Sequence, residues 1–581
     1  MHQDTIYHIR HSLAHICAAV MLEKYPGTQL GIGPVIEHGF YYDFLTPTQI
    51  TQGDLVSLEQ KMRTLIKKNL DFVRSELTIA EALRFFSSQP FKKELINDLA
   101  QKGEKNVSLY TSGTFIDLCQ GPHVSNTKEI PLEGFRLTKI AGAYWRGDEK
   151  NQMLTRIYGV AFMTKKELDD YLLLQEELLK RDHKKIGKEQ ELFTIIPEIG
   201  SGLPLFYPKG ALLRSIVEKV IFDLQEKKGY QSIWLPHLTK SELYQISGHL
   251  EKYDALYPPM KLEGESEYYI KPMNCPHFML LYNSTPHSYR ELPIRWVSTT
   301  TVYRYEKSGE LSGLLRVRAI TQDDCHVFAT PAQMEKEILL MLSMIQEVYR
   351  IFGFKDFWVR ISTHDPHNKE KYIGDKNIWK ESEAILTKLI QKKKWKYEIG
   401  IGEAAFYGPK LDFIIRDALG REWQLSTIQL DMNLPERFSL TYIDQEGNKK
   451  RPIVIHRAIL GSTERFLAIL IEHYGGAFPL WLAPEQIWVC PLGKTHHRYA
   501  KEVTKQLTQS SFRAVLKNKN ESIGKKIREG EKQKIPYLLI IGDQEVKRTL
   551  VAVRKRNKGD LGTQKVSLFI KYLRREVEKR Q

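Results

Sequence analysis

Apolar positions in the N-terminal part of the chain change between helical and strand-like spacing. Apolar side chains in residues 1–20 recur at helical intervals. Residues 27–44 are rich in glycine and aromatic residues, which predicts short strands and turns. Residues 58–76 and 81–88 have the spacing of amphipathic helices. We therefore predict an N-terminal α+β domain over residues 1–163.

A long helical segment follows this domain. From Lys165 to about Lys188 the sequence keeps helical spacing, contains no proline and becomes basic at its end. These properties are typical of a linker helix, which we place at residues 164–189.

The middle of the chain, residues 190–481, mixes helices with β-rich runs. A helix is predicted over 211–228, ended by Gly229, and a strand follows it and stops at Pro236. Another helix is predicted over 331–352, and further strands over 294–306, 314–328, 358–363, 410–417 and 421–432. This order predicts a mixed, mainly antiparallel sheet and not a regular βαβ alternation. No GxxxxGK[ST] or GxGxxG stretch precedes a helix, so the sequence does not support a P-loop or a Rossmann nucleotide site.

The pattern changes again after WLAP (481–484). Short strands alternate with helices, the strands over 486–492, 512–518, 537–543 and 549–556 and the helices over 496–509 and 522–533. We predict a small α/β domain with a very basic surface over residues 482–581.

Length and composition narrow the classes of protein to which the chain can belong. A chain of 581 residues is too long for one hydrophobic core. No window approaches about 18 uncharged apolar residues, and the N-terminus lacks the features of a secretion signal, so we expect neither a membrane span nor a cleaved leader. Five scattered cysteines argue for a reducing cytoplasm and against a disulfide framework. The formal charge of +16 fits a polyanionic partner such as RNA, with a generally basic proteome as the alternative explanation.

Two arginine-bearing segments have chemistry suited to a nucleotide. In TVYRYEKSGEL (301–311), Arg304 and Glu306 precede a glycine-containing loop and a second strand with Arg316. Guanidinium groups pair bidentately with phosphate, so this segment fits a hairpin over a nucleotide, and it also fits a solvated surface hairpin. In HRAILGSTERFLAILIEHY (456–474), Arg465 lies early in a predicted helix, where an ordinary amphipathic helix with a surface arginine is the simpler interpretation.

Three distant residues form a candidate metal site. Cys275, His326 and His456 offer one thiolate and two imidazoles, and a catalytic Zn²⁺ site uses three protein ligands with a fourth position open. Cys325 is a rival thiolate, but neighbours on a strand face opposite sides, so it and His326 do not easily bind one ion. Nothing in the spacing alone links the three.

A second cluster of candidate ligands lies in the N-terminal domain. His11 and His15 are one helical turn apart, and DLCQGPHV brings Asp117, Cys119 and His123 into a predicted tight loop. Spacing alone leaves three interpretations open, namely a Zn²⁺ site, a buried structural cluster and a metal-free catalytic site.

Several stretches together resemble the class II aminoacyl-tRNA synthetases, and within them the threonyl-tRNA synthetase family. They are IKPMNCP, RVRAITQDDCHVF, EAAFYGPKLDF, IQLDMNLPERF and HRAILGSTERF. The resemblance runs from about His8 to the C-terminus. It implies a multidomain α+β protein with an antiparallel class II catalytic core, an N-terminal editing domain and a C-terminal anticodon-binding domain.

The resemblance implies substrates, cofactors and partners. A member of this family activates L-threonine with ATP, transfers it to tRNA(Thr), and hydrolyses mischarged Ser-tRNA(Thr). It uses one Zn²⁺ per chain and Mg²⁺ with ATP, and its motif 1, here the helix before Gly229 and the strand to Pro236, builds a homodimer. Serine lacks only one methyl of threonine, worth roughly 1–3 kcal/mol, so binding alone is too weak a filter and a second, hydrolytic site is expected.

Residue roles follow from the same resemblance. The catalytic residues would be Arg304 and Arg465, and both would bind ATP together with Glu306 and Arg316. The Zn²⁺ ligands are Cys275, His326 and His456, and the amino-acid pocket contains Gln322, Asp324, Tyr407 and Gln429. The editing residues are His11, His15, Asp117, Cys119 and His123, with Tyr42 and Lys92 as further members. The family generally edits without a catalytic metal, which favours that interpretation and leaves the metal question open. The anticodon-binding residues are Asn520, Glu545 and Arg554.

The sequence departs from the family pattern in two places. Bacterial members usually begin with a ubiquitin-like domain, whereas this sequence starts directly at the editing-like domain, so we expect a bacterial type without it. Residues 275–278 read CPHF where the family commonly has CPGH, which puts His277 beside Cys275. That imidazole either perturbs the local turn or competes for the metal. Because the neighbouring segments are intact, we expect an active site.

Two other functions are the alternatives. A non-catalytic RNA-binding paralogue would be favoured by the loss of Arg304, Arg465 or a zinc ligand, and all are present. A free-standing hydrolase of mischarged tRNA would use only the N-terminal domain and would leave most of the chain without a purpose.

Overall fold

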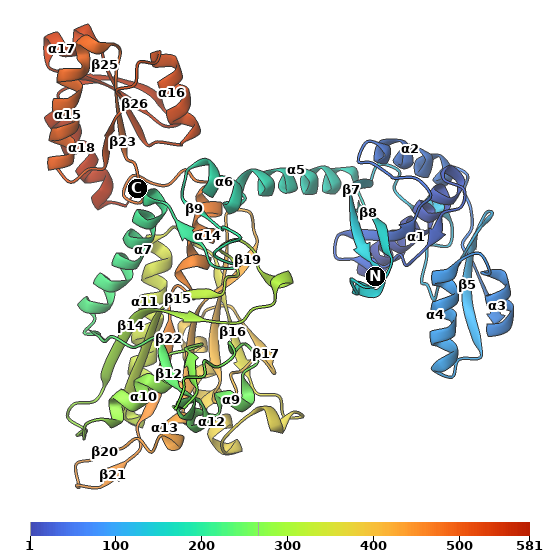
Figure 1. Cartoon of the computed structure of the whole chain (residues 1–581), viewed down its shortest axis with the longest axis horizontal. Helices are drawn as coiled ribbons and strands as arrows, with labels where there is room; N and C mark the ends of the chain where they lie inside the picture. Colours follow the sequence, from blue (N-terminus) through green and yellow to red (C-terminus); the bar gives the residue numbers. More distant parts are fainter. Residues whose placement is uncertain (1, 265, 581) are drawn as a thin grey trace. The chain divides into compact units, whose positions relative to one another are not determined.

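The structure is a computed structural model that describes residues 2–264 and 266–580. The chain divides into two compact units between Glu177 and Leu178, inside the predicted linker (Figure 1). Among the described residues, we find no helix with both the length and the apolar composition needed to cross a membrane.

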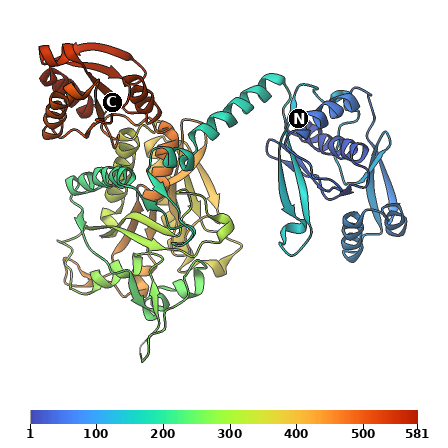
Figure 2. The same ribbon diagram turned by 45° about the horizontal axis from the view of Figure 1, so that its top comes forward.

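The first unit contains two small sheets and their helices. One sheet has the strand order β1-β3-β8-β7, with β2 beside β3, and it packs with α1 and α2 around one hydrophobic core. The other sheet has the order β4-β5-β6 and carries α3 and α4. The bounds of the first sheet and its helices are α1 His2–Lys24, β1 Gln29–Leu30, β2 Val35–Ile36, β3 Gly39–Leu45, α2 Asp54–Ile66, β7 Phe135–Tyr144 and β8 Met153–Ala161. The bounds of the second are β4 Val73–Thr78, α3 Ile79–Phe85, α4 Pro90–Gln101, β5 Asn106–Ser112 and β6 Phe115–Leu118. In Figure 2 the long strands β7 and β8, drawn in cyan, run side by side.

The helix predicted over residues 58–76 is wrong in its second half. The helix α2 ends at Ile66, Asn69 takes a left-handed φ of 55°, and a strand begins at Val73. This strand, β4, pairs residue by residue with β5, so the sheet and not the local apolar spacing decides the conformation.

The predicted linker is a helix with one break. The helix α5 (Lys165–Arg181) ends before Asp182, which caps α6 (His183–Glu189) by accepting hydrogen bonds from the amides of Lys184 and Lys185. An aspartate at this position favours a new helix start, because its side chain satisfies free backbone donors.

The second unit is built on a mainly antiparallel sheet of eight strands, as the sequence predicts. The strand order is β11-β14-β15-β22-β19-β18-β16-β17, and only the two outermost pairs are parallel. The strands are β11 Gln231–Ser232, β14 Ile294–Tyr303, β15 Ala319–Ala329, β16 Phe357–Thr363, β17 Tyr397–Ile401, β18 Lys410–Arg416, β19 Glu422–Asp431 and β22 Ile453–Ala458. The strand predicted up to Pro236 is therefore much shorter than expected.

Four helices cover one face of this sheet and form the largest hydrophobic core. They are α7 Pro208–Lys227, α11 Met334–Ile351, α12 Lys376–Lys393 and α14 Thr463–Tyr474. The remaining strands of this part form separate two-stranded sheets, β9 with β10, β12 with β13 and β20 with β21. The bounds of these strands and of the short helices among them are β9 Phe193–Thr194, β10 Leu205–Phe206, β12 Leu238–Lys240, α8 Ser241–Ser247, α9 His249–Lys252, β13 Tyr268–Ile270, α10 Cys275–Asn283, α13 Leu434–Arg437, β20 Tyr442–Ile443 and β21 Lys449–Lys450. Because strand side chains alternate, Cys325 enters this core while His326 faces the other side, as expected for neighbours on a strand.

The C-terminal part of this unit is an α/β layer structure, also as predicted. Its sheet has the order β24-β23-β25-β26-β27, in which the first three strands are parallel and the last two antiparallel. The elements are β23 Ile487–Pro491, α15 His497–Gln509, β24 Ala514–Leu516, α16 Ile523–Lys532, β25 Tyr537–Ile541, α17 Asp543–Arg548, β26 Val551–Lys555, β27 Gly559–Gln564 and α18 Val566–Glu578.

Candidate functional sites

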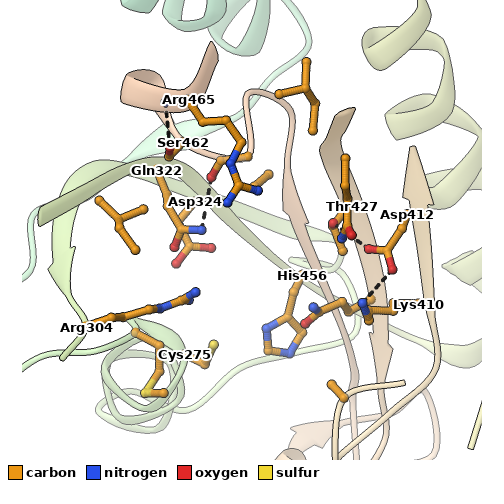
Figure 3. Close-up of a pocket in the computed structure, with 18 of the residues that line it drawn as sticks. Cys275, Arg304, Gln322, Asp324, Lys410, Asp412, Thr427, His456, Ser462 and Arg465 are labelled. Atoms are coloured by element: carbon orange, nitrogen blue, oxygen red, sulfur yellow. Dashed lines mark hydrogen bonds and ion pairs between the residues drawn. The ribbon is translucent and has the colours of Figure 1, made fainter. Parts of the chain in front are cut away.

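A cavity of about 420 Å³ opens on the face of the large sheet away from the helical core (Figure 3). Most of the residues predicted to bind ATP, threonine or zinc line it: Cys275, Arg304, Glu306, Arg316, Gln322, Asp324, Tyr407, Gln429, His456 and Arg465. His326 lies behind the cavity wall and is fully buried. Segments separated by nearly two hundred residues thus meet at one place, as the resemblance requires.

The three predicted zinc ligands come together. The ligand atoms of Cys275, His326 and His456 all lie within 4.8 Å of one another, and all three residues are buried. His326 and His456 are cross-strand partners on β15 and β22, and Cys275 is the first residue of α10. Strand pairing therefore supplies the link that spacing could not.

The donor atoms of this group fit a metal ion. Both ring nitrogens of His326 and Nδ1 of His456 are buried without a hydrogen-bond partner. His456 Nε2 lies 2.8 Å from Asp431 Oδ2, so the carboxylate accepts a hydrogen bond and directs Nδ1 inward. Burial lowers the pKa of His326 well below its ordinary value, so its imidazole is neutral, which is the form that binds metals.

His277 does not join this group. Its side chain is buried beside Cys275, and neither ring nitrogen has a hydrogen-bond partner among the described residues. Burial and then the nearby Lys271 lower the pKa of His277 to about 4, so the imidazole is neutral. The three ligand atoms assemble without it.

Three guanidinium groups converge on the other part of the cavity. Arg304 donates to the Pro272 carbonyl, and Arg465 donates to the Leu315 carbonyl at 3.0 Å. Arg316 forms an ion pair with Glu306 at 2.7 Å. Burial, followed by repulsion from Arg304 and Arg316, lowers the pKa of Arg465. Concentrated positive charge of this kind suits a polyphosphate.

The start of α14 is fixed by local chemistry. The Ser462 hydroxyl accepts from the Arg465 amide at 3.1 Å and caps the helix. Gly461 has a φ of +68°, and a Cβ there would lie 2.6 Å from the Leu425 carbonyl oxygen, so only glycine fits. Gln322 donates to the Gly461 carbonyl at 3.2 Å, which connects the helix start to β15.

Polar side chains lie between the cysteine–histidine group and the arginines. Asp324 accepts from the Asn274 amide at 2.9 Å, and burial raises its pKa. The Tyr407 hydroxyl donates to Gln429 at 2.5 Å. These partly buried acceptors and donors suit the amino group and hydroxyl of a small amino acid.

Further residues of the cavity wall were not predicted from the sequence. Lys410 Nζ lies 2.5 Å from Asp412 Oδ2, and the Thr427 hydroxyl donates to Asp412 Oδ1 at 2.9 Å (Figure 3). The available signal was the alternation in GPKLDF, which puts Lys410 and Asp412 on the same face of a strand. His249 also lines the cavity.

The first unit holds the second predicted cluster, complete. The ligand atoms of His11, His15, Cys119 and His123 lie within 4.8 Å of one another. Cys119 Sγ is 3.3 Å from Nε2 of both His11 and His123. The loop that brings Cys119 and His123 to α1 contains Gly121, whose φ is +76°.

A buried aspartate anchors the remaining members of this cluster. Asp117 accepts from Lys92 at 2.6 Å and from the Tyr42 hydroxyl at 2.5 Å, and its carboxylate lies 3.9 Å from His15. The His11 Nδ1 faces the Pro122 carbonyl at 3.0 Å, so it carries a proton and Nε2 is free to accept.

Burial controls the protonation of this cluster. It lowers the pKa of each of the three imidazoles and raises the pKa of Cys119 to about 11. Neutral imidazoles suit both metal binding and general base chemistry, so both interpretations stay open.

Family descriptions match three parts of the chain. "tRNA synthetase class II core domain (G, H, P, S and T)" matches residues 259–474, and "Anticodon binding domain" matches residues 486–576. "Threonyl and Alanyl tRNA synthetase second additional domain" matches residues 107–158.

Curated relatives match nearly the whole chain. A protein of Rubrobacter xylanophilus named threonine–tRNA ligase is 48% identical over 581 residues, which is 100% of this chain and 90% of the relative. A protein of the same name from Azobacteroides pseudotrichonymphae is 46% identical, over 98% of this chain and 88% of the relative. The chain belongs to the threonine–tRNA ligase family.

Solved structures agree with membership of the threonine–tRNA ligase family. The RNA binding domain of threonyl-tRNA synthetase from Cryptosporidium parvum has a TM-score of 0.65 at 34% identity, covering 68% of this chain and 98% of that chain. The threonyl-tRNA synthetase ThrRS-1 from Aeropyrum pernix has a TM-score of 0.59 at 30% identity, with 69% and 96% covered.

The family matches are distributed unevenly over the predicted sites. All predicted ATP, amino-acid and zinc residues lie inside the class II core match. The match in the first unit includes Asp117, Cys119 and His123 but not His11 or His15. Asn520, Glu545 and Arg554 lie inside the anticodon match.

The three predicted anticodon residues have separate surroundings in the structure. Asn520 lies in an exposed loop, Glu545 accepts from the Gly542 amide at 2.9 Å, and Arg554 lies 3.4 Å from Glu531. Within the described residues, no hydrogen bond or ion pair joins them to one another.

Proposed function

We propose that this protein activates L-threonine with ATP to threonyl-adenylate, releases diphosphate, and transfers the threonyl group to tRNA(Thr). The observation that carries the proposal is one cavity that is lined both by the three converging arginines and by Cys275 and His456, two members of the buried Cys275/His326/His456 group. We assign residues 190–481 to the catalytic domain, 1–163 to editing, 164–189 to the linker and 482–581 to anticodon binding.

The arginines and their partners position ATP in this proposal. Attack of the threonine carboxylate on the α-phosphorus builds negative charge, which fixed guanidinium groups stabilise. Arg304 serves the α-phosphate and Arg465 the γ-phosphate, with Glu306 and Arg316 beside them. ATP binds together with Mg²⁺.

The cysteine–histidine group explains the choice of amino acid. Cys275, His326 and His456 would hold one Zn²⁺, which supplies open positions for the amino group and hydroxyl of threonine. Gln322, Asp324, Tyr407 and Gln429 complete the pocket. Valine has no hydroxyl, so it leaves these polar groups unsatisfied and is rejected.

Serine requires a separate site. Serine has the hydroxyl, and its missing methyl lets the catalytic site discriminate against it by only about 10–200-fold relative to threonine. We propose that His11, His15, Asp117, Cys119 and His123, with Tyr42 and Lys92, hydrolyse Ser-tRNA(Thr). Two features support this proposal, the complete cluster and the match to a domain shared by threonyl and alanyl enzymes.

Partners follow from the same proposal. Asn520, Glu545 and Arg554 contact unpaired anticodon bases, and the surrounding basic residues hold phosphates. A second copy of the chain covers the apolar side chains near α7, among which Phe222 is half-exposed and Trp234 is 79% exposed. All five cysteines are free, which suits a cytoplasmic protein.

One experiment tests the central proposal. Wild-type protein loaded with zinc is assayed for threonine-dependent ATP–pyrophosphate exchange and for metal content, beside Cys275→Ser. We expect one zinc per wild-type chain, and loss of both zinc and exchange in the variant. Cys490→Ser, which changes a buried cysteine of the C-terminal sheet, is the control and keeps both. Zinc-loaded wild-type protein without exchange would favour a non-catalytic RNA-binding protein.

A further inference from the structure

A buried histidine joins α6 to the loop that carries Arg316. His183 is the first residue of α6 and is 1% exposed. Its Nδ1 lies 2.6 Å from Glu472 Oε1, and the Leu314 amide donates to its Nε2 at 3.1 Å. Because Nε2 accepts, the proton of the neutral ring is on Nδ1, which donates to Glu472. Both ring nitrogens are therefore engaged.

This histidine is not part of a metal site, although Asp182, His183 and Glu472 lie close enough to hold an ion. Asp182 Oδ1 already accepts from two backbone amides at the start of α6, at 2.7 and 3.1 Å. The second oxygen of Glu472 forms an ion pair with Arg421. Asp182, His183 and Glu472 therefore have protein partners for their hydrogen bonds, and they fix the position of the backbone around them.

The loop held by His183 serves two arginines of the cavity. Leu315, directly after Leu314, accepts from Arg465 at 3.0 Å, and Arg316 forms its ion pair with Glu306. At Gly313 a Cβ would lie 2.2 Å from His183 Nε2, so the loop approaches the ring only because this residue is glycine.

The same histidine also contacts the helix that carries Arg465. Glu472 lies on α14, seven residues after Arg465, which is two helical turns along the same helix. His183 thus connects the loop and the helix from which Arg316 and Arg465 extend.

We propose that His183 is a positioning residue for ATP: by accepting the Leu314 amide while donating to Glu472, it fixes the loop at 312–316 against α14. The proposal rests on the proposed function, because it assigns these arginines to ATP. The amino-acid pocket lies on other elements, so the Michaelis constant for threonine does not depend on this contact.

Two substitutions separate the two hydrogen bonds of His183. In His183→Gln the terminal amide reaches the place of Nε2, and its oxygen accepts the Leu314 amide, while the backbone amide of residue 183 still donates to Glu472 at 3.1 Å. In His183→Asn the shorter amide reaches the place of Nδ1 and donates only to Glu472. Loss of one hydrogen bond corresponds to a change of about 2–10-fold in an equilibrium constant. We expect His183→Asn to raise KM for ATP in pyrophosphate exchange by that factor, and His183→Gln to stay closer to wild type. KM for threonine stays unchanged in both.

His473→Ala is the matched control, because it removes an imidazole next to Glu472 that faces Phe354 instead of the loop. If His183→Asn does not fold, Gly313→Ala replaces it, since its methyl pushes the loop away and leaves the bond to Glu472. An unchanged KM for ATP in the folded variant, equal effects of Gln and Asn, or an equal rise in His473→Ala would each overturn the proposal. Wild-type protein without exchange would instead overturn the proposed function.

Discussion

At the scale of single residues, a carboxylate behind His456 decides how well the proposed zinc site is preorganised. Asp431 accepts from His456 Nε2 with one oxygen and from the amides of Asn433 and Leu434 with the other. This arrangement fixes both the tautomer and the ring orientation of His456.

Asp431→Asn is therefore expected to weaken zinc binding about 10–100-fold. Its amide can donate to Nε2 and move the ring proton to Nδ1, the nitrogen that must bind the metal. Zinc affinity is measured by competition with a chromogenic chelator. Asp444→Asn makes the same chemical change in an exposed turn and is expected to bind zinc as tightly as wild type. Equal zinc affinities for Asp431→Asn and wild type would contradict this role.

A buried lysine near the cavity makes stability depend on pH. Lys271 is completely buried and donates to the Thr300 hydroxyl at 2.9 Å. Burial, opposed by attraction to Asp324, lowers its pKa from 10.5 to about 8. Below pH 8 both folded and unfolded chains carry the proton, so the cost of the buried charge is constant. Between pH 8 and 10.5 the unfolded chain binds more protons, so this cost falls as the pH rises.

Relative to wild type, the folding stability of Lys271→Met is expected to be highest at pH 7 and to lose this advantage as the pH rises toward 10. At about 1.4 kcal/mol per pKa unit, the pH-dependent part of the difference in unfolding free energy between the variant and wild type is about 1–3 kcal/mol. The lost hydrogen bond to Thr300 adds an offset that does not change with pH. Melting temperatures of both proteins at pH 7, 8.5 and 10 test this. Lys261→Met, at an 80% exposed side chain, is the control. A difference that stays constant over this range would refute the prediction.

At the scale of elements, the start of α14 is the most demanding piece of backbone in the cavity. Gly461→Ala adds a methyl in the left-handed region and against the Leu425 carbonyl. The resulting shift moves the acceptor of Gln322 and the first turn that carries Arg465. We expect kcat/KM for ATP–pyrophosphate exchange to fall about tenfold or more, equivalent to at least ~1.4 kcal/mol.

Gly447→Ala separates backbone strain from the local collision. Gly447 has a φ of +84°, yet a Cβ there meets nothing within 4 Å. This variant carries the same kind of strain in the turn between β20 and β21 and is expected to keep full exchange. Equal losses in both glycine variants would show that general destabilisation, not the position of α14, is responsible.

Elements with strong local signals were predictable from the sequence. The helix at α14 and the strand β15 follow from spacing and residue type, and the opposite orientation of Cys325 and His326 follows from alternation. The strand β22 was not predicted, because the stretch from His456 was interpreted as the start of a helix. The pairing of His326 with His456 did not follow from the sequence, because the register of two strands 130 residues apart is set by the whole sheet. The strand β4 was missed for the same reason, since its partner β5 overrides an amphipathic pattern.

The roles of the cavity residues needed the family resemblance. Spacing alone suggested Cys275, His326 and His456 as one weak group among several, and an exposed arginine for Arg465. Lys410 and Asp412 were not predicted as site residues, because a strand with alternating charged residues usually indicates a solvated face. Only the fold turns that face into a cavity wall.

At the scale of the whole molecule, the two proposed chemistries lie in different units. The His/Cys cluster belongs entirely to the residues before Glu177, and every residue of the large cavity belongs to those after Leu178. Each unit has its own hydrophobic cores. Damage to one site should therefore leave the structure of the other intact.

We expect the two activities to be separable by substitution. Arg465→Ala abolishes threonine activation and hydrolyses chemically prepared Ser-tRNA(Thr) at the wild-type rate. His11→Ala combined with His15→Ala does the reverse, keeping pyrophosphate exchange and losing hydrolysis. His38→Ala, a half-exposed histidine in the first unit, is the control and keeps both activities. Loss of hydrolysis in Arg465→Ala would mean that threonine activation and the hydrolysis of Ser-tRNA(Thr) share a site. The zinc content of the double variant decides whether the cluster binds a metal. A second zinc in wild type that the double variant loses indicates a metal site. One zinc per chain in both proteins indicates that the neutral imidazoles of His11 and His15 act on water themselves.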